Sequence, residues 1–380
     1  MSIRKWALRL WTPALAVSLV VATPALLYSA PNPGNSFAQH NLVSDLPGMA
    51  YFTDPDLVNP WGVSFAPTSP FWVSDNGTGL STLYTGTGTK LGLVVTIPPP
   101  AGQQGPSAPT GQVNNFGSAP FVFATENGTI AAWSGGTSAV LKVDNSASGS
   151  VYKGLATASV GSNSYLYATN FHNGTIDVFD TNFNKVTLGG TFTDPSLPAG
   201  YAPFNIQSSG GMLYVTFALQ DAAKHDDVAG PGHGFVDVFD TNGNLVQRLV
   251  SMGALNSPWG MAWAPAGFGK FSGDLLVGNF GDGTINAFDA MGNLVGKLDD
   301  KNGNPLVNMG LWDIIFGNMG AGSSPNTLYF TAGIPGPGNV EDHGLFGTVT
   351  ATPEPGTLTL LGSGLASLIG YGWRKGKRAA

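Results

Sequence analysis

Short apolar runs recur along the chain between about residue 40 and residue 350, for example residues 121–123, 165–167 and 275–277. Each is followed, within about ten residues, by a glycine-containing turn and a second run in which apolar and polar residues alternate. Alternation with a period of two predicts half-buried β-strands, and Asn-Gly or Asp-Gly between two such runs predicts a tight hairpin. The chain is therefore expected to be all-β.

The second run of each pair is an internal repeat. Three segments have nearly the same amino-acid sequence: residues 173–180, 233–240 and 282–289. Two further segments, residues 127–133 and 343–349, are weaker copies of it. A further repeated element precedes each pair: residues 60–63 and 258–261 are almost identical, and residues 311–314 are a variant. We align the six units on the small or polar residue in this element. The aligned positions lie 43 to 55 residues apart and are Gly62, Gly111, Gly154, Asn205, Gly260 and Asp313.

Six units of about 50 residues, each with four strands, predict a six-bladed β-propeller. Small residues fit the aligned positions, because the innermost strands of a propeller crowd around its axis. The sixth unit ends near Thr350 after only three strands, and the segment 40–45 resembles a fourth strand that lacks its own unit. We therefore expect residues 40–45 to complete the sixth blade and close the ring. The chain has no cysteine, so this closure takes the place of a disulfide.

The two ends of the chain predict export and anchoring. Arg4, Lys5 and Arg9 precede an apolar stretch, as in a signal peptide. Two small-residue cleavage sites fit, at residues 23–25 and 36–38, and we favour cleavage after Ala38; a retained N-terminal anchor is the alternative. Near the other end, an apolar run from residue 357 to 373 is just long enough to cross a bilayer. The basic residues that follow it predict a cytoplasmic end.

Pro353, Glu354 and Pro355 stand directly before that apolar run. This order of motif, apolar run and basic tail resembles the PEP-CTERM sorting signal of Gram-negative bacteria. The resemblance implies export, anchoring in the cell envelope by the C-terminus with the body outside the cytoplasm, and processing by an exosortase that can release the body to the extracellular matrix. A plain C-terminal transmembrane anchor is the alternative.

The body resembles an uncharacterised family of bacterial six-bladed propellers that carry PEP-CTERM tails, and more distantly NHL-repeat and lactonase-type propellers. The expected domains are a signal peptide (1–38), the propeller (39–350) and the sorting signal with its transmembrane helix and basic tail (351–380).

The charge of the body excludes some partners. Seven of the 16 basic residues and one of the 23 acidic residues lie in the two ends, which leaves nine basic and 22 acidic residues in the body, a net charge of −13. Nucleic acids and anionic lipids need clustered Lys and Arg, so neither is an expected partner. Polysaccharides, envelope proteins and cations remain, and the body is expected to be monomeric.

Candidate binding residues gather on one predicted face. In a propeller, the loops between second and third strands share a face with the starts of the first strands, and long loops on a rigid scaffold commonly carry function. Two of these loops are long, residues 220–234 and 333–344. The candidate loop residues are Asp75, Asn76, Glu126, Asn170, His172, Asp226, Asp227, Asn279, Asp282, Asp342 and His343. Asp and Asn also simply form turns, and His172, His233 and His343 occupy equivalent positions that favour a repeated structural role.

Three tryptophans and two axial residues complete the candidate set. Trp61, Trp259 and Trp312 stand at the starts of inner strands, where they would either stack on a sugar ring or pack between blades. Asn205 and Asp313 would line the channel and, with the loop carboxylates, could hold Ca²⁺ or another divalent cation. The resemblance to lactonase-type propellers implies a metal bound by a channel Glu, two Asn and an Asp. This body has no Glu at the start of an inner strand.

The sequence contains no nucleophile elbow, phosphate loop or zinc-protease motif. We therefore expect a non-catalytic binding or structural module for extracellular polysaccharide or protein partners, with no required cofactor. The alternative is a divalent-metal-dependent lactonase or hydrolase at the channel mouth.

Overall fold

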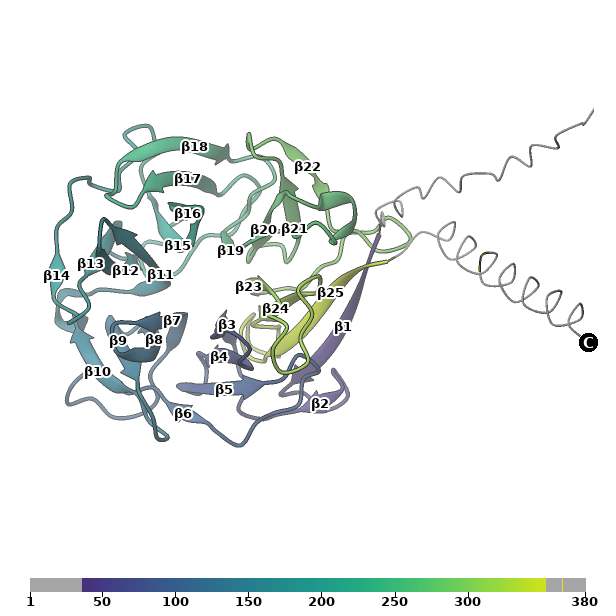
Figure 1. Ribbon diagram of the computed structural model, residues 1–380, viewed down its shortest axis with the longest axis horizontal. Helices are drawn as coiled ribbons and strands as arrows, with labels where there is room; N and C mark the ends of the chain where they lie inside the picture. The colour runs from purple at the N-terminus through teal and green to yellow at the C-terminus, as the bar shows by residue number, and fades with distance from the viewer. Residues whose placement is uncertain (1–35, 353–363, 365–380) are drawn as a thin grey trace, which may run out of the picture.

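The computed structural model describes residues 36–352 and residue 364. These residues form six sheets arranged as a ring around one axis (Figure 1), which confirms the predicted six-bladed β-propeller. The expected signal peptide as far as residue 35, and the expected spanning segment 357–373 apart from residue 364, lie outside the described residues. Within the described part of the chain, no helix is long and apolar enough to cross a membrane.

The first three blades each contain four antiparallel strands, numbered from the axis outwards in chain order. Blade 1 contains β3 (Pro60–Ser64), β4 (Phe71–Asp75), β5 (Leu80–Tyr84) and β6 (Val95–Thr96). Blade 2 contains β7 (Pro109–Phe116), β8 (Ala119–Thr125), β9 (Thr129–Trp133) and β10 (Val140–Asp144). Blade 3 contains β11 (Tyr152–Val160), β12 (Asn163–Asn170), β13 (Thr175–Phe179) and β14 (Lys185–Val186), and the short helix η1 (Ser146–Ser148) precedes it.

The other three blades repeat this order. Blade 4 contains β15 (Tyr201–Ser209), β16 (Met212–Leu219), β17 (Phe235–Asp240) and β18 (Leu245–Ser251). Blade 5 contains β19 (Pro258–Trp263), β20 (Leu275–Asn279), β21 (Ile285–Phe288) and β22 (Leu294–Lys297), with the short helix η2 (Gly269–Phe271) between its first two strands. Blade 6 contains β23 (Leu311–Phe316), β24 (Leu328–Ala332) and β25 (Leu345–Thr352), followed by β1 (Ser36–Ser44) and β2 (Phe52–Thr53) from the start of the chain.

The ring closes through β1, as the sequence predicts. Strand β1 pairs antiparallel with β25 from Ser36↔Thr352 to Ser44↔Leu345. The strand begins at Ser36, three residues before the expected propeller boundary. Phe37 is 2% exposed, and its ring stacks on Phe271 at 5.6 Å. Residues 36–38 are therefore part of the packed sixth blade.

Small residues at the aligned positions have a steric explanation. A Cβ atom on Gly62 would lie 2.6 Å from the carbonyl oxygen of Thr110 in the next blade, and one on Gly260 would lie 2.6 Å from the carbonyl oxygen of Trp312. No real Cβ approaches a backbone atom that closely. The inner strands therefore approach one another around the axis, and the alignment of the six units is confirmed.

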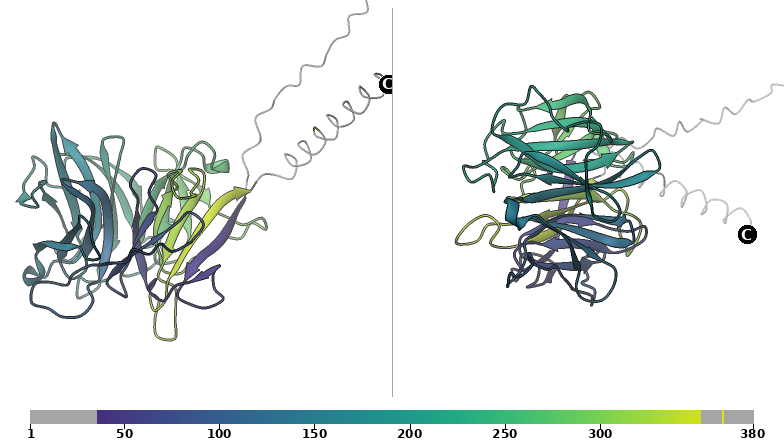
Figure 2. Two further views of the ribbon diagram at one scale, coloured as in Figure 1. Left: turned by 60° about the horizontal axis from the view of Figure 1, so that its bottom comes forward. Right: turned by 90° about the vertical axis from the view of Figure 1, so that its left-hand side faces the viewer.

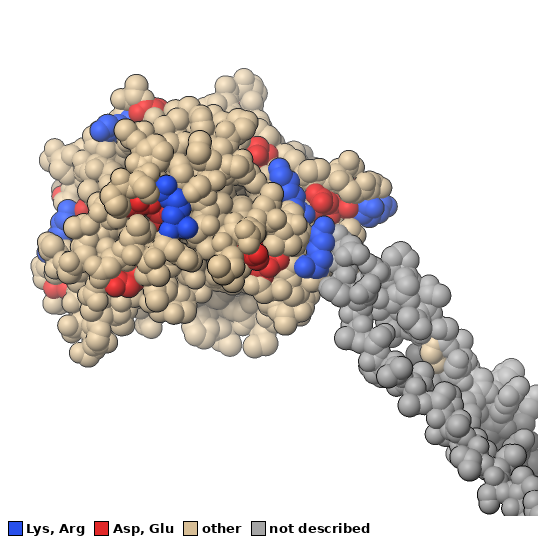
Figure 3. All heavy atoms as spheres, turned by 90° about the horizontal axis from the view of Figure 1, so that it is seen from above, with Lys and Arg blue, Asp and Glu red and all other residues tan. Residues whose placement is uncertain are grey.

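The blades pack through apolar layers, one of which joins blades 1 and 6 through Phe71, Tyr84, Tyr329 and Phe346. Charged residues are sparse on the side of the ring that Figure 3 shows, and several of the basic side chains there lie beside an acidic one. Ion pairs among the described residues include Lys90 with Asp54 at 2.7 Å and Lys185 with Asp177 at 2.7 Å. The charged residues of this acidic body are thus partly neutralised locally.

Candidate functional site

The loops between second and third strands lie together on one face of the ring, which we call the loop face. They include the two long segments, residues 220–234 and 333–344. Figure 2 shows the loop between β24 and β25 projecting on the side away from the end of β25. The paired residues Ser36 and Thr352 lie at that other end, on what we call the tail face. The candidate loops and the paired residues Ser36 and Thr352 therefore lie on opposite faces.

A buried lysine lies at the axis of the loop face. Lys153 is the second residue of β11 and is only 1% exposed. Its ammonium forms an ion pair with Glu126, lies 3.7 Å from a carboxylate oxygen of Asp226, and sits 4.8 Å from the ring centre of Trp61. A buried ammonium is stable only when its charge is paired. Glu126 and Asp226 come from the loops of blades 2 and 4, so the lysine joins three blades.

A chain of hydrogen bonds extends this pair to blades 1 and 6. Asn76 donates to Glu126 at 2.9 Å, and Asn59 donates to Asn76 at 3.3 Å and to Glu341 at 3.0 Å. The indole nitrogen of Trp312 donates in turn to Asn59 at 3.0 Å. We call this group the axial cluster; it contains Asn59, Asn76, Glu126, Lys153, His225, Asp226, Asp227 and Glu341.

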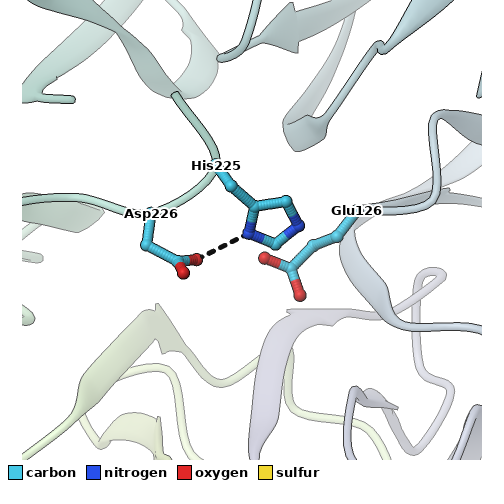
Figure 4. Close-up of side chains that lie close together, drawn as sticks. All are labelled: Glu126, His225 and Asp226. Atoms are coloured by element: carbon cyan, nitrogen blue, oxygen red, sulfur yellow. Dashed lines mark hydrogen bonds and ion pairs between the residues drawn. The ribbon is translucent and has the colours of Figure 1, made fainter. Parts of the chain in front are cut away.

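The exposed part of the axial cluster comes from the 220–234 loop. The imidazole of His225 donates to the carboxylate of Asp226 at 2.9 Å, and their side chains are 46% and 67% exposed. Figure 4 shows the imidazole of His225 directed toward the carboxylate of Glu126 while Asp226 lies on its other side. These two side chains are the part of the cluster that a ligand on the loop face would reach first.

Two carboxyl groups of the cluster titrate near neutral pH. Burial, and then the negative charge of Glu126, raise the pKa of Glu341 to about 7, and burial raises the pKa of Asp227 to about 6. Burial acts to lower the pKa of Lys153, but attraction to Glu126 outweighs it and raises the pKa, so the ammonium stays charged. A hydrogen bond to Asp226 raises the pKa of His225. The cluster can therefore both donate and accept hydrogen bonds around pH 6 to 7.

Several buried polar atoms around the axis lack a hydrogen-bond partner among the described residues. They are the indole nitrogens of Trp61 and Trp259, one carboxylate oxygen of Asp227 and the hydroxyl of Ser257. Buried polar atoms are nearly always paired in proteins, and each exception requires an explanation. Hydrogen-bonding capacity is thus unused close to the axial cluster.

The donor atoms of Glu126, His225 and Asp226 all lie within 4.8 Å of one another, close enough to hold a metal ion. The ammonium of Lys153 already contacts both Glu126 and Asp226, however. A divalent cation on these oxygens would lie next to that ammonium and be repelled by it. The set therefore fits poorly as a metal centre, because the chain itself supplies the positive charge.

The three predicted tryptophans are not an open stacking surface. Trp61, Trp259 and Trp312 are each 1% exposed, and Trp61 stacks on Trp312 with ring centres 3.4 Å apart. Trp259 packs edge-on against Trp61 at 6.0 Å and against Trp312 at 5.9 Å. We call these three rings the tryptophan plug. Their repeated position reflects packing where six blades converge, which is the second of the two roles that the sequence left open, and they do not form an accessible surface for a sugar ring.

The two predicted channel residues lie beyond the plug. Asp313 accepts backbone N–H groups of Val63 at 2.8 Å and Ile314 at 2.9 Å. Asn205 accepts from the N–H of Ile206 at 2.8 Å and donates to the carbonyl of Trp259 at 2.8 Å. Both line a cavity whose walls include neither Glu126 nor Lys153. They bind neighbouring blades together and do not converge with the loop carboxylates.

Asp75 does not reach the surface of the loop face. It is 0% exposed, and neither of its carboxylate oxygens has a hydrogen-bond partner among the described residues. Burial raises the pKa of Asp75 well above the usual range of an aspartate. The sequence analysis placed Asp75 in the loop after this strand, whereas the structure makes it the last residue of β4 and covers its side chain.

The remaining predicted residues mostly brace their own loops. Asn170 donates to Asp177 at 3.1 Å, and Asn279 donates to the carbonyl of Ala254 at 2.9 Å. Asp282 accepts from the hydroxyl of Thr284 at 2.7 Å, and Asp342 accepts from the N–H of Gly338 at 2.8 Å. These side chains act as turn residues.

The equivalent histidines likewise remain apart. His343 bonds Asp45 at 2.6 Å, His233 bonds the carbonyl of Val228 at 2.8 Å, and His172 is partly exposed in its own short loop. The repeated positions therefore have local roles.

The axial cluster contains four residues outside the predicted set: Asn59, Lys153, His225 and Glu341. Lys153 could have been found from the repeat alignment. The residue before each aligned position is Trp61, Thr110, Lys153, Phe204, Trp259 or Trp312. A single lysine among mostly aromatic residues at the axis is the signal, because such a charge must find partners there. Glu341 and Asn59 gave no comparable signal, since each lies in a loop whose path depends on other blades.

Comparison with known proteins identifies one motif and a set of relatives. Residues 351–378 match the PEP-CTERM protein-sorting motif. Uncharacterized protein L690 of Acanthamoeba polyphaga mimivirus is 37% identical over 289 residues, which is 70% of this chain and 75% of that protein. Uncharacterized protein R648 of the same virus is 35% identical over 292 residues, 71% of each chain. Because these relatives are viral, the expected bacterial origin stays a prediction.

Solved structures support the fold. A protein of unknown function from Bacteroides thetaiotaomicron has a TM-score of 0.52 at 10% identity and covers 83% of this chain and 76% of its own. Virginiamycin B lyase from Staphylococcus aureus has a TM-score of 0.50 at 14% identity, covering 83% of this chain and 99% of its own. Similarity at this level of identity concerns the propeller fold alone.

Proposed function

This chain belongs to the protein family of the mimivirus proteins L690 and R648, and from that premise we propose that it is an exported propeller that binds neutral extracellular polysaccharide through the axial cluster. The sorting motif at residues 351–378 marks it as an exported, envelope-associated protein and implies processing by an exosortase. The observation that carries the binding proposal is the convergence of five blades on Lys153 and its carboxylate and amide partners.

The chemistry of the axial cluster suits hydroxyl groups. Carboxylates and amide oxygens accept hydrogen bonds from sugar hydroxyls, and the Asn76 amide and the His225 imidazole can donate to them. The acidic body, with a net charge of −13 from nine basic and 22 acidic residues, would repel an anionic polymer. A neutral polysaccharide is therefore favoured over an acidic one.

The position of Ser36 and Thr352, the first residue of β1 and the last of β25, supports the same proposal. Residues 36 and 352 lie paired on the tail face, and the sorting motif follows directly from β25. A propeller held at that end would turn its loop face away from the point of attachment, as the side views in Figure 2 suggest. The axial cluster would then face outward, where an extracellular polymer is accessible.

The proposal is tested by retention of the purified full chain on immobilised neutral and acidic polysaccharides. Asp226→Asn changes an exposed member of the cluster, and Asp289→Asn makes the same change on an outer turn as a matched control. We expect retention on a neutral polysaccharide that Asp226→Asn weakens about tenfold, roughly the value of a hydrogen bond to a charged group. Equal retention of both variants, or no retention on any polymer, would contradict the proposal.

The alternative, a divalent-metal-dependent lactonase or hydrolase, is favoured only by the spacing of Glu126, His225 and Asp226. Adding Ca²⁺, Mg²⁺ or Zn²⁺ in a thermal-shift experiment distinguishes the two. If a metal ion stabilises the protein, Asp226→Asn abolishes that stabilisation, and the protein hydrolyses lactones only with the metal, then the enzymatic function is correct and the polysaccharide-binding function is not.

A further inference from the structure

The cavity lined by Asn205 and Asp313 lies on the other side of the tryptophan plug from the axial cluster. It measures about 330 Å³ and is surrounded by the inner strands of all six blades, β3, β7, β11, β15, β19 and β23. Its wall residues lie in the parts of these strands nearest the tail face, and Trp259 of the tryptophan plug is the one aromatic residue among them. The tryptophan plug therefore lies between the axial cluster and this cavity, which we call the channel.

The channel wall combines unused polar groups with aliphatic surface. Gln207 has a buried side-chain oxygen without a hydrogen-bond partner in the described part of the chain. The side chains of Asn114, Thr157 and Ser208 add an amide and two hydroxyl groups, and Leu155 and Met261 supply apolar surface. By contrast, the amide of Gln112 is occupied, since it donates to the carbonyls of Gly62 at 2.6 Å and Trp72 at 2.9 Å. The free polar groups therefore come from blades 2, 3 and 4.

The charge of the wall narrows the class of ligand. Asp313 is the one ionisable residue among the wall residues, which contain no Lys, Arg or His. An anionic molecule would meet a carboxyl group and no counter-charge. A hard divalent cation needs six or more oxygen ligands in the case of Ca²⁺, while the carboxylate of Asp313 already accepts two backbone N–H groups. An uncharged molecule is the best match.

We propose that this channel is a separate binding site for one uncharged, hydroxyl-rich molecule of about the size of a single sugar residue. Ligand pockets in proteins begin at about 300 Å³, and the channel lies at that lower limit with its 330 Å³. Sugar rings have apolar C–H faces and hydroxyl edges, which matches aliphatic walls with amide and hydroxyl groups between them. This site is independent of the axial cluster and of the function proposed for it.

Isothermal titration calorimetry of the full chain with glucose, mannose, galactose and N-acetylglucosamine tests the proposal. Gln207→Leu removes the unpartnered amide, and Thr157→Phe fills the channel. Gln247→Leu makes the first change on the exposed outer strand β18 as a matched control. We expect saturable binding of at least one sugar, weakened about tenfold by Gln207→Leu, abolished by Thr157→Phe and unchanged by Gln247→Leu. Far-ultraviolet circular dichroism of each variant verifies its fold.

Two outcomes would overturn the proposal. A channel that holds only water would give no saturable heat with any of the four sugars. Binding that Asp226→Asn weakens, and that the two channel variants leave unchanged, would place the sugar at the axial cluster instead. Conversely, if the unchanged protein binds a monosaccharide in the channel but is not retained on any polysaccharide, the proposed function is refuted and the channel site stands.

Discussion

Replacing Asp313 by asparagine tests how a carboxyl group is held at the axis of the ring. Burial in the channel raises the pKa of Asp313 from 3.8 to about 7. In the unfolded chain the group ionises near its ordinary pKa, so between these two values the folded protein holds a proton that the unfolded chain has lost. The free energy of unfolding therefore falls as pH rises from about 4 to about 7, because the unfolded state binds fewer protons.

The magnitude follows from the size of the shift. Each pKa unit corresponds to 1.36 kcal/mol, so a rise from 3.8 to about 7 destabilises the folded protein by about 4 kcal/mol above pH 7. Asparagine has no such penalty, and Asn205 occupies the equivalent position in blade 4 with both amide atoms bonded. The substitution does remove one acceptor for the N–H of Val63, a loss of about 1 kcal/mol.

We expect the two effects to cross over with pH. Asp313→Asn should be less stable than the unchanged protein by about 1 kcal/mol at pH 4 and more stable by about 3 kcal/mol above pH 7. Urea unfolding at several pH values measures both curves, and the pH dependence of the other buried acids cancels in their difference. Parallel curves from pH 4 to pH 8 would refute the reasoning, because the carboxyl group would then titrate alike in both states.

Three further predictions concern Lys153 and strand β1, which closes the ring. Lys153→Met should lower the free energy of unfolding by about 3 kcal/mol, with partial recovery when Glu126→Gln is added, and urea unfolding that shows no loss would contradict a buried ion pair. Deleting residues 39–46 should sharply lower the melting temperature, since it removes most of the strand that closes blade 6; an unchanged melt would rule out that closure. N-terminal sequencing of the exported protein should place the first residue of the mature chain at or before Ser36, because cleavage after Ala38 would remove the packed ring of Phe37. Replacing Phe37 by alanine should lower the free energy of unfolding by about 3 kcal/mol. A mature start after Ala38 with an unchanged melting temperature would contradict the last prediction.

Repetition carried most of the fold information. Alternating apolar positions determine which side chains enter the layers between blades, and the sixfold recurrence sets the number of sheets. The sequence also indicates the close approach of the inner strands at the axis, because glycine occupies positions 62 and 260, where a Cβ atom would clash with the next blade. The sequence also predicted how the last unit obtains its fourth strand, because one predicted strand at the start of the repeats belonged to no unit and could complete the sixth blade.

The candidate site depended on tertiary structure. Lys153 and Glu126 come from different blades, and only the convergence of these blades makes them an ion pair. Local pattern likewise could not tell that Asp75 would be covered, or that Trp61 and Trp312 would stack into a plug with 1% exposure each. Period and spacing are properties of neighbouring residues, so the sequence alone determined the blades and their order. Which polar side chains meet, and which of them reach solvent, is decided where six distant segments converge on one axis, and that packing belongs to the tertiary structure.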